Sequence, residues 1–391
     1  MKQIYALIIL LLVCLISVFY YFHKPALHLQ QTVFTNLPDW NKSQNLKALV
    51  AFKKSCKVFL KLAPTKEVGG KFIKMRAQDW YPSCLALAEL RKETEDDARL
   101  FFEKWFTPVA FVESKPLEGL FTGYYMPILD GSLEKTIKYS VPLYKMPSDM
   151  LTIEGSLFDE SLKNRKLIGR VKKNKVVPYY TRKEIDHGAI AQKADVIAWV
   201  ASPVERMFLE IQGSGVIEIK DRKQKKYIGY AAENGAAYKA IASVLISEGV
   251  MTKDNASMQR IRKYLEENPK DMDRILHQNK SFVFFRETDV KAAIGSQGVA
   301  LTPGRSLAVD LKWIPIGTPI WLTTTYPDAT GNQELPLRRL MVAQDTGGAI
   351  RGPVRGDVFW GEGKDAADIA GRMKNPGFYW LLLPKHIARD M

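Results

Sequence analysis

Residues 345–363 read DTGGAIRGPVRGDVFWGEG, and this glycine-rich stretch decides how the rest of the chain is interpreted. It holds six glycines, two aspartates about a dozen residues apart and an adjacent Phe-Trp pair. Glycine at this density indicates backbone that adopts positive φ or approaches another group closely. The stretch therefore predicts either a functional site or a tight turn of a β-barrel.

Length and composition indicate a folded chain of two or three domains. The chain has 391 residues, 46% of them apolar, which is enough to bury a core. Helical spacing of apolar residues predicts helices in 45–63, 94–106, 230–249 and 255–268. Short apolar or alternating runs predict strands from residue 117 onward, including MFLEIQGSGVIEI at 207–219. We expect an α+β fold that is mainly β.

The N-terminus carries a long apolar segment. Residues 4–22 contain no charged side chain, and about 19 residues form a helix roughly 28 Å long, enough to cross a bilayer core. A cleaved signal peptide has a shorter apolar region that ends in small residues. Residues 1–25 are therefore predicted to be an uncleaved membrane anchor, with a signal segment as the alternative. Lys2 favours export of the body that follows.

Export bears on the partners and on the two cysteines of the body. In an oxidising compartment Cys56 and Cys84 predict a disulfide, with two buried free thiols as the alternative. The net charge of +15 would suggest nucleic acid in the cytosol, but an exported chain meets the cell wall and anionic lipid instead. We expect no nucleic-acid partner; a soluble basic surface is the alternative explanation of the charge.

The residues present disfavour several kinds of catalytic site. The five histidines are dispersed, and neither H-E-x-x-H nor C-x-x-C occurs, so no metal site and no cofactor is expected. Ser214 lies in G-S-G and not in the nucleophile elbow of a serine hydrolase. Carboxylates remain the candidates for catalysis.

Asp357 is placed to act as an acid. A glycosidic bond is cut by protonating a poor leaving oxygen, so a carboxyl group held partly protonated by apolar neighbours is the minimum requirement. Asp357 precedes Val358, Phe359 and Trp360, which can raise its pKa, and Trp360 can supply an aromatic face for a sugar ring. The alternatives are a turn aspartate and a core tryptophan.

Seven stretches of the sequence, three in the C-terminal region and four upstream, share a resemblance to one known family. The C-terminal stretches are AVDLKWIPIGTPIWL (308–322), MVAQDTGGAIRG (341–352) and RGDVFWGEGKDAADIAGRM (355–373). The upstream stretches are LFTGYYMP (120–127), EIQGSG (210–215), YAAENGAAY (230–238) and SFVFF (281–285). Together, over about residues 110–385, they resemble the membrane-bound lytic murein transglycosylase A family, whose three-aspartate domain would place its aspartates at Asp310, Asp345 and Asp357.

The resemblance implies a double-psi β-barrel domain with a second β-rich domain inserted into it and a groove between the two. The barrel domain, with its N-terminal helices, would use residues 26–125 and 291–391, and the insert would use residues 126–290. A psi barrel crosses its loops tightly, which calls for glycine and accounts for the stretch at 345–363.

The resemblance also implies the chemistry. The family cleaves the β-1,4 bond between N-acetylmuramic acid and N-acetylglucosamine of peptidoglycan without water, and forms 1,6-anhydromuramyl products during cell-wall turnover. Asp357 carries over as the catalytic residue, first acid and then base, with Asp345 and Asp310 as supporting residues. The candidate sugar contacts are Tyr124, Tyr125, Gln212 and Trp360. For Tyr125 and Gln212, packing at the domain junction is the alternative.

Two other functions and two cellular locations remain as alternatives. A hydrolytic glucanase would need a second carboxylate as base, Asp345 or Glu362, and a wall-binding scaffold would need no catalysis. Known members of the family are outer-membrane lipoproteins, whereas the long apolar run and the bulky Val13 before Cys14 favour a periplasmic body anchored to the inner membrane. An outer-membrane lipoprotein modified at Cys14 is the alternative. The expected partners are glycan strands and the membrane; a cell-wall synthesis complex is a further candidate.

Overall fold

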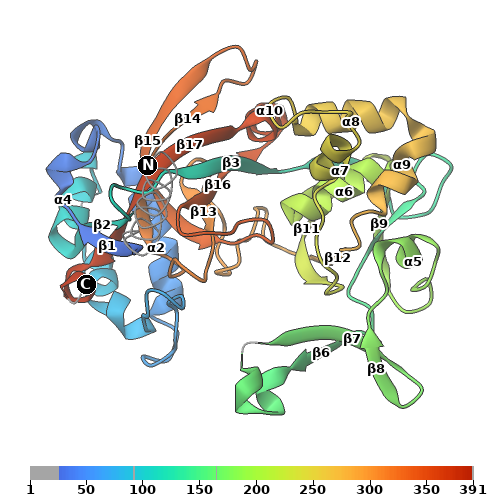
Figure 1. Cartoon of the computed structure of the whole chain (residues 1–391), viewed down its shortest axis with the longest axis horizontal. Helices are drawn as coiled ribbons and strands as arrows, with labels where there is room; N and C mark the ends of the chain where they lie inside the picture. The colour runs from blue at the N-terminus through green and yellow to red at the C-terminus, as the bar shows by residue number, and fades with distance from the viewer. Residues whose placement is uncertain (1–25, 91–92, 164, 390–391) are drawn as a thin grey trace, which may run out of the picture.

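The computed structural model of the chain describes residues 26–90, 93–163 and 165–389. Two β bodies lie along its long axis, and strand β3 (Gly119–Met126) runs from one toward the other (Figure 1). The mainly β, mixed architecture predicted from the sequence is confirmed. The apolar segment and Cys14 lie outside the described residues. Within the residues that are described, no helix has both the length and the apolar character needed to cross a membrane.

The first body is a closed barrel. The strand order around the ring is β17-β14-β15-β13-β16-β3, and the ring is closed by the pairing of β3 with β17. Two of its pairings, β13 with β15 and β16 with β3, are parallel, as a double-psi barrel requires when its loops cross. The other barrel strands are β13 (Ser306–Val309), β14 (Pro319–Pro327), β15 (Glu334–Asp345), β16 (Arg355–Glu362) and β17 (Lys374–Pro384).

Strands and helices from the N-terminal part of the chain cover one side of the barrel. β2 (Phe106–Val112) pairs with β17, and β1 (His28–Gln31) pairs with β2. The helices are α2 (Leu46–Phe59), α3 (Tyr81–Ala88) and α4 (Glu95–Trp105). A capping box starts α4: Thr94 Oγ1 accepts a hydrogen bond from the backbone N–H of Asp97, and the Asp97 side chain accepts one from the backbone N–H of Thr94.

A disulfide joins two of these helices. Cys56 of α2 and Cys84 of α3 are bonded to each other, with their Cα atoms 5.1 Å apart. Both side chains are buried, and beside them Phe59 stacks on Trp80 with ring centroids 5.1 Å apart. The bond fixes α3 on α2 at the edge of the barrel core.

The second body is a six-stranded sheet that curls almost closed. Its order is β12-β11-β10-β4-β9-β5, and Lys145 after β5 forms a bridge to Phe285 of β12. The strands are β4 (Ile128–Ser132), β5 (Val141–Tyr144), β9 (Val196–Val200), β10 (Ser214–Ile219), β11 (Gln224–Glu233) and β12 (Val283–Glu287). Its helices are α5 (Arg182–Asp186), α6 (Pro203–Gln212), α7 (Ile241–Ser247), α8 (Met258–Glu267) and α9 (Pro269–Leu276).

Two segments of this body differ from the predictions. Residues 207–212 were expected to be part of a strand but form the end of α6. The helix begins at the N-cap Ser202, whose side chain accepts from the N–H of Val204, and ends at Gly213 with φ 75°, a typical helix stop. Residues 230–233 were expected to be helical but end β11, which pairs with β12. Small residues there left the helix and strand patterns hard to distinguish.

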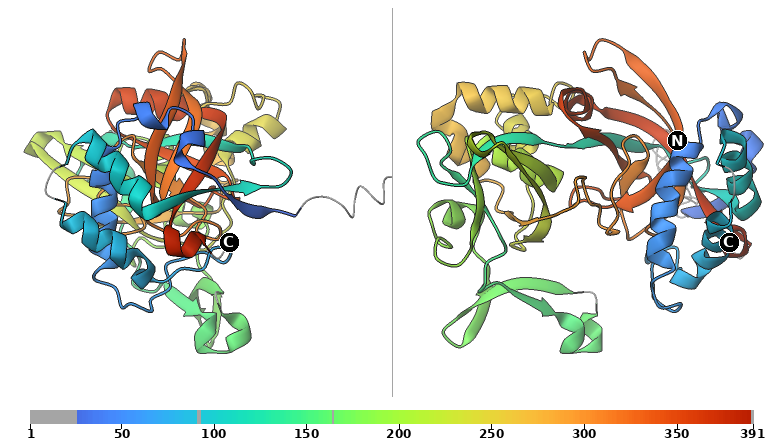
Figure 2. Two further views of the ribbon diagram at one scale, coloured as in Figure 1. Left: turned by 90° about the vertical axis from the view of Figure 1, so that its left-hand side faces the viewer. Right: turned by 180° about the vertical axis from the view of Figure 1, so that it is seen from behind.

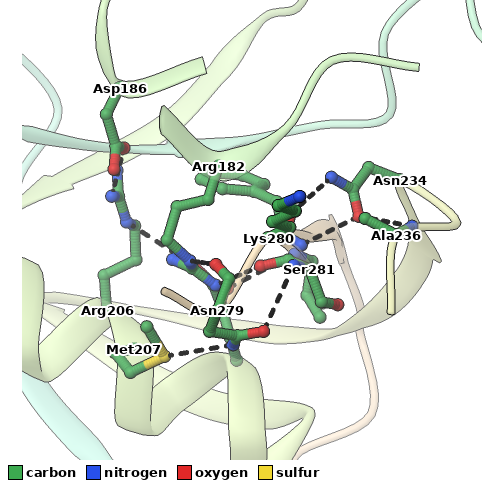
Figure 3. Close-up of polar contacts among 12 residues, drawn as sticks. Arg182, Asp186, Arg206, Met207, Asn234, Ala236, Asn279, Lys280 and Ser281 are labelled. Atoms are coloured by element: carbon green, nitrogen blue, oxygen red, sulfur yellow. Dashed lines mark hydrogen bonds and ion pairs between the residues drawn. The ribbon is translucent and has the colours of Figure 1, made fainter. Parts of the chain in front are cut away.

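A buried ion-pair network fixes α6 in the second body (Figure 3). Arg182 Nη1 donates to Glu210 Oε1 at 3.1 Å, and Nη2 of Arg182 also pairs with Glu210. Arg206 lies 3.4 Å from the same carboxylate and pairs with Asp186. Asn234 donates to the backbone oxygens of residues 180 and 280. Glu210 and Asn234 lie in the EIQGSG and YAAENGAAY stretches, so these stretches hold the body together.

A three-stranded sheet projects from the second body. It contains β6 (Leu151–Glu154), β7 (Lys166–Lys172) and β8 (Lys175–Pro178), in that order. It stands apart from both β bodies in Figure 1 and in the rear view of Figure 2.

Candidate active site

A row of side chains crosses four neighbouring strands of the barrel. Asp357 of β16 pairs with Thr122 of β3 on one side and with Ala308 of β13 on the other. Ala308 in turn pairs with Asp345 at the end of β15. Residues opposite one another in adjacent strands share a face, and strands lie about 4.8 Å apart, so the backbones of the two aspartates are about 10 Å apart. Ala308 is the residue between them in the register.

The row lies on the outer wall of the barrel, where the two β bodies meet. Ala308, Tyr124 and Phe359 belong to a buried cluster that also contains Val216 of β10. Val358, which points the other way along β16, belongs instead to the barrel core. The rings of Tyr124 and Phe359 pack with their centroids 5.2 Å apart, next to the carboxylates.

Asp357 has the properties expected of an acid. The residue as a whole is half-buried, and its carboxyl accepts a hydrogen bond of 2.6 Å from Thr122 Oγ1. Arg355 Nη2 donates to that same hydroxyl at 2.9 Å. Burial raises the pKa of Asp357 to about 6; the Thr122 hydrogen bond and the charge of Arg355 oppose the rise, and the charge of Asp345 adds to it. A carboxyl with this pKa is protonated about half of the time near pH 6, where an ordinary aspartate is almost fully ionised.

Asp345 is held by three hydrogen bonds. One carboxylate oxygen accepts from the backbone N–H groups of Ser296 and Thr346, each at 2.9 Å. The other accepts from the hydroxyl of Tyr124 at 2.9 Å. Burial raises the pKa of Asp345, and these hydrogen bonds oppose the rise. The carboxylate therefore ties the loop at residue 296 to the end of β15 and orients the Tyr124 ring.

Asp310 joins two turns. Its side chain is 6% exposed, and its oxygens accept from the backbone N–H groups of Lys312 at 3.1 Å and Gly352 at 2.8 Å. It thereby ties the turn after β13 to the loop that leads into β16. These contacts are those of a residue that shapes the loop carrying Asp357.

Trp360 lies on the other side of β16 from the expected acid. It is three positions after Asp357 and therefore points to the opposite face. Its ring packs on that of Tyr326, with centroids 4.7 Å apart. A Cβ at Gly123 would lie 2.8 Å from the indole and 2.9 Å from Ala370, so glycine is what allows the ring to lie against β3.

Tyr125 and Gln212 meet at the junction of β3 with α6. The backbone N–H of Tyr125 donates to Gln212 Oε1 at 2.9 Å. The Tyr125 ring packs with Ala366 and Ala370 of α10 (Lys364–Arg372), and burial raises the pKa of its hydroxyl. The structure thus brings Asp357, Asp345 and Tyr124 together. Tyr125 and Trp360 instead pack together on the opposite face of β3 and β16, and Gln212 binds the backbone of Tyr125.

The sequence interpretation missed Thr122, Arg355 and Ser296. Thr122 and Asp357 are 235 positions apart, and only the parallel pairing of β3 with β16 brings them together. A signal was present, because Thr122 lies in LFTGYYMP and Arg355 opens RGDVFWGEG. Ser296 contributes a backbone N–H, which leaves no mark in the sequence.

The described part of the chain lacks a cluster of side chains that could bind a metal ion. No group of three or more His, Cys, Asp or Glu side chains that could hold a metal ion occurs in residues 26–90, 93–163 or 165–389.

The barrel, the second β body and the carboxylate row define a two-domain double-psi β-barrel protein. The family description "MltA specific insert domain" matches residues 120–286, and the "3D domain" matches residues 305–383. LtgG, a lytic transglycosylase of Burkholderia pseudomallei, is 34% identical, with a TM-score of 0.57 over 93% of this chain and 97% of that one. The chain belongs to the membrane-bound lytic murein transglycosylase A family.

Other relatives agree with this assignment. The solved structure of the membrane-bound lytic murein transglycosylase of Agrobacterium tumefaciens is similar with a TM-score of 0.82 and 28% identity, over 93% of this chain and 99% of that one. Membrane-bound lytic murein transglycosylase A of Escherichia coli K12 is 32% identical over 265 residues. That match covers 67% of this chain and 65% of the curated relative, so it spans slightly less than two thirds of the relative's length.

Proposed function

We propose that the protein is a peptidoglycan lytic transglycosylase that cleaves the β-1,4 bond between N-acetylmuramic acid and N-acetylglucosamine. The observation that carries this proposal is Asp357, a half-buried residue on the outer wall of the barrel whose carboxyl has a pKa raised to about 6 by burial. The family membership supports the reaction class. A solved structure of the E. coli relative holds chitohexaose, which supports a glycan as the substrate.

The reaction needs one carboxyl group. Protonated Asp357 gives its proton to the oxygen that leaves with N-acetylglucosamine as the glycosidic bond breaks. The resulting carboxylate then accepts the proton of the 6-hydroxyl of the muramyl residue, whose oxygen bonds to C1 and closes the 1,6-anhydro ring. Asp357 ends as it began, and no water is consumed. Thr122 and Arg355 hold the carboxyl in place throughout.

The environment of the other carboxylates disfavours hydrolysis. An inverting hydrolase holds its two carboxyl groups about 6.5–9.5 Å apart around a water. Glu362 lies five positions after Asp357 on the same strand, which corresponds to about 16 Å. Asp345 is nearer, but both of its oxygens already accept hydrogen bonds from Ser296, Thr346 and Tyr124. We assign Asp345 an electrostatic role, since its charge raises the pKa of Asp357.

A wall-binding scaffold does not need a proton donor, so the raised pKa of Asp357 favours an enzyme over a scaffold. Tyr124, beside the acid, is our candidate for direct contact with the sugar at the cleavage point. Tyr125, Gln212 and Trp360 face away from Asp357, so any sugar that they contact would be bound away from the cleavage point, farther along the glycan strand. We also propose the division into a barrel domain of residues 26–125 and 291–391 and an insert of residues 126–290, with the substrate groove between them.

The test is the release of anhydro-muropeptides from purified peptidoglycan as a function of pH. Because the protonated acid starts the reaction, kcat/KM falls as the pH rises through about 6. Thr122→Val removes a hydrogen bond that lowers the pKa of Asp357, so this limb moves to higher pH. Asp345→Asn removes a charge that raises the pKa, so the limb moves to lower pH. Shifts in the same direction, or none, would contradict the assignment of Asp357.

The relatives indicate attachment to a membrane but not which membrane of the cell envelope. They are membrane-bound by name, which supports attachment to the cell envelope. We propose a periplasmic body anchored to the inner membrane through residues 1–25. If Cys14→Ser leaves the size and the membrane association of the protein unchanged, a spanning anchor is supported; loss of a lipid-modified form would instead favour an outer-membrane lipoprotein.

A further inference from the structure

The projecting sheet of β6, β7 and β8 has one face made of apolar residues. In its register Leu151 pairs with Gly169, Ile153 with Leu167, Gly169 with Pro178, and Val171 with Val176. Directly paired residues share a face. The outer face, as we call it, therefore consists of Gly169 and six apolar side chains: Leu151, Ile153, Leu167, Val171, Val176 and Pro178.

The opposite face of this sheet attaches it to the second body. Ile168 lies against Gly235, where an added Cβ would be 2.7 Å from it. The guanidinium carbon of Arg170 lies 4.0 Å from the ring centroid of Tyr180. Because Ile168 and Arg170 point toward the body, the outer face points away from it.

The outer face remains exposed to solvent. Leu167 is 64% exposed, Val171 61% and Val176 53%. Beyond the end of β6, Leu157 and Phe158 are more exposed still, at 79% and 73%. A soluble body seldom leaves a continuous apolar sheet face uncovered, and such a face usually marks an interaction site.

The charge along β7 and β8 is basic, whereas Glu154, Asp159 and Glu160 lie at the other end of the sheet. Residues 161–183 contain lysines and arginines but no aspartate or glutamate. Three of these side chains, Lys172, Lys173 and Lys175, surround the turn between β7 and β8 and are exposed. These lysines extend from the turn and from the inner face, which is the face that carries Ile168 and Arg170. If the outer face rested on a surface, the lysines would therefore lie above the apolar side chains. Apolar side chains below basic ones match the acyl boundary and the phosphate layer of an anionic membrane.

We propose that the outer face of this sheet docks the body on the surface of a membrane that contains anionic lipid. A second copy of the chain is the alternative occupant, and the oligomeric state in detergent distinguishes it from a membrane. The inference goes beyond the proposed function and does not depend on it. It gives the body a second membrane contact, separate from the N-terminal segment, that would set the orientation of the barrel above the bilayer.

The test measures the depth of two adjacent positions in the full-length protein. Leu151 lies on the outer face and Thr152 on the inner face, and both are exposed. Leu151→Trp and Thr152→Trp are each reconstituted into phosphatidylcholine vesicles, with and without phosphatidylglycerol, whose acyl chains carry bromine. The wild-type fluorescence is subtracted, and unchanged melting temperatures show that both variants are folded.

We expect acyl-chain bromine to quench most of the added fluorescence of Leu151→Trp in vesicles with phosphatidylglycerol. It should quench much less of the fluorescence of Thr152→Trp, and less of either in phosphatidylcholine alone. Lys172→Glu with Lys175→Glu should remove the dependence on phosphatidylglycerol. Equal quenching at the two positions, or none at Leu151→Trp, would overturn the proposal. So would a dimer in detergent that Leu167→Glu converts to a monomer, because the occupant would then be a second copy.

Discussion

Replacement of Asp357 by asparagine should stabilise the protein while abolishing its turnover. The pKa of this carboxyl is raised from 3.8 to about 6 in the folded chain, so the folded protein binds the proton more tightly than the unfolded chain does. Stability is therefore lost as the pH rises from about 4 to about 6, and the loss persists above that. A shift of about 2 units corresponds to about 3 kcal/mol. Asparagine cannot ionise and escapes this loss.

The assay is urea unfolding of the wild type and of Asp357→Asn across that pH range. We expect the stability difference in favour of the variant to grow by about 1–3 kcal/mol between about pH 4 and about pH 8. Asp328→Asn is the matched control. The pKa of Asp328 is lowered by a hydrogen bond from Thr330, so this substitution should become less favourable as the pH rises. A stability difference for Asp357→Asn that does not change with pH would refute the assigned environment of the carboxyl.

Three further predictions concern the site and the scaffold. Asp357→Asn should lower anhydro-muropeptide release at least about 10²–10⁴-fold, since one residue acts as both acid and base. Asp345→Asn should lower the release by a smaller factor. An Asp345→Asn variant that is inactive but has a normal melting temperature would contradict this order. Glu210→Gln should destabilise the protein by about 3–5 kcal/mol in urea unfolding, because it leaves the buried guanidinium of Arg182 without its counter-charge; a cost under about 1 kcal/mol would refute the role given to the network. Cys56→Ser with Cys84→Ser should cost about 3 kcal/mol, and a reducing agent should lower the melting temperature of the wild type but not of this variant.

The strands of the barrel could be predicted from the residues, whereas their closure into a barrel followed from the family resemblance. FYWLLLP holds three aromatic residues, which is typical of a strand, and it forms most of β17. The second body was harder to predict. The end of α6 was taken for a strand, although Ser202, Pro203 and Gly213 mark the two ends of a helix.

The candidate site could be predicted only as far as neighbouring positions in the sequence allow. The motifs identified Asp310, Asp345 and Asp357, but the pairing of Asp357 with Thr122 depends on strand register across most of the chain. The position of Trp360 could have been inferred: a spacing of three along a strand places it on the face opposite Asp357.

The central claim is that the muramyl 6-hydroxyl, and not water, attacks the sugar. The most direct measurement is the mass of the products when the protein digests peptidoglycan in water enriched in heavy oxygen. The account predicts muropeptides that are one water lighter than hydrolytic products and that carry no heavy oxygen at the new end. Reducing-end products labelled with heavy oxygen would show hydrolysis and would contradict it.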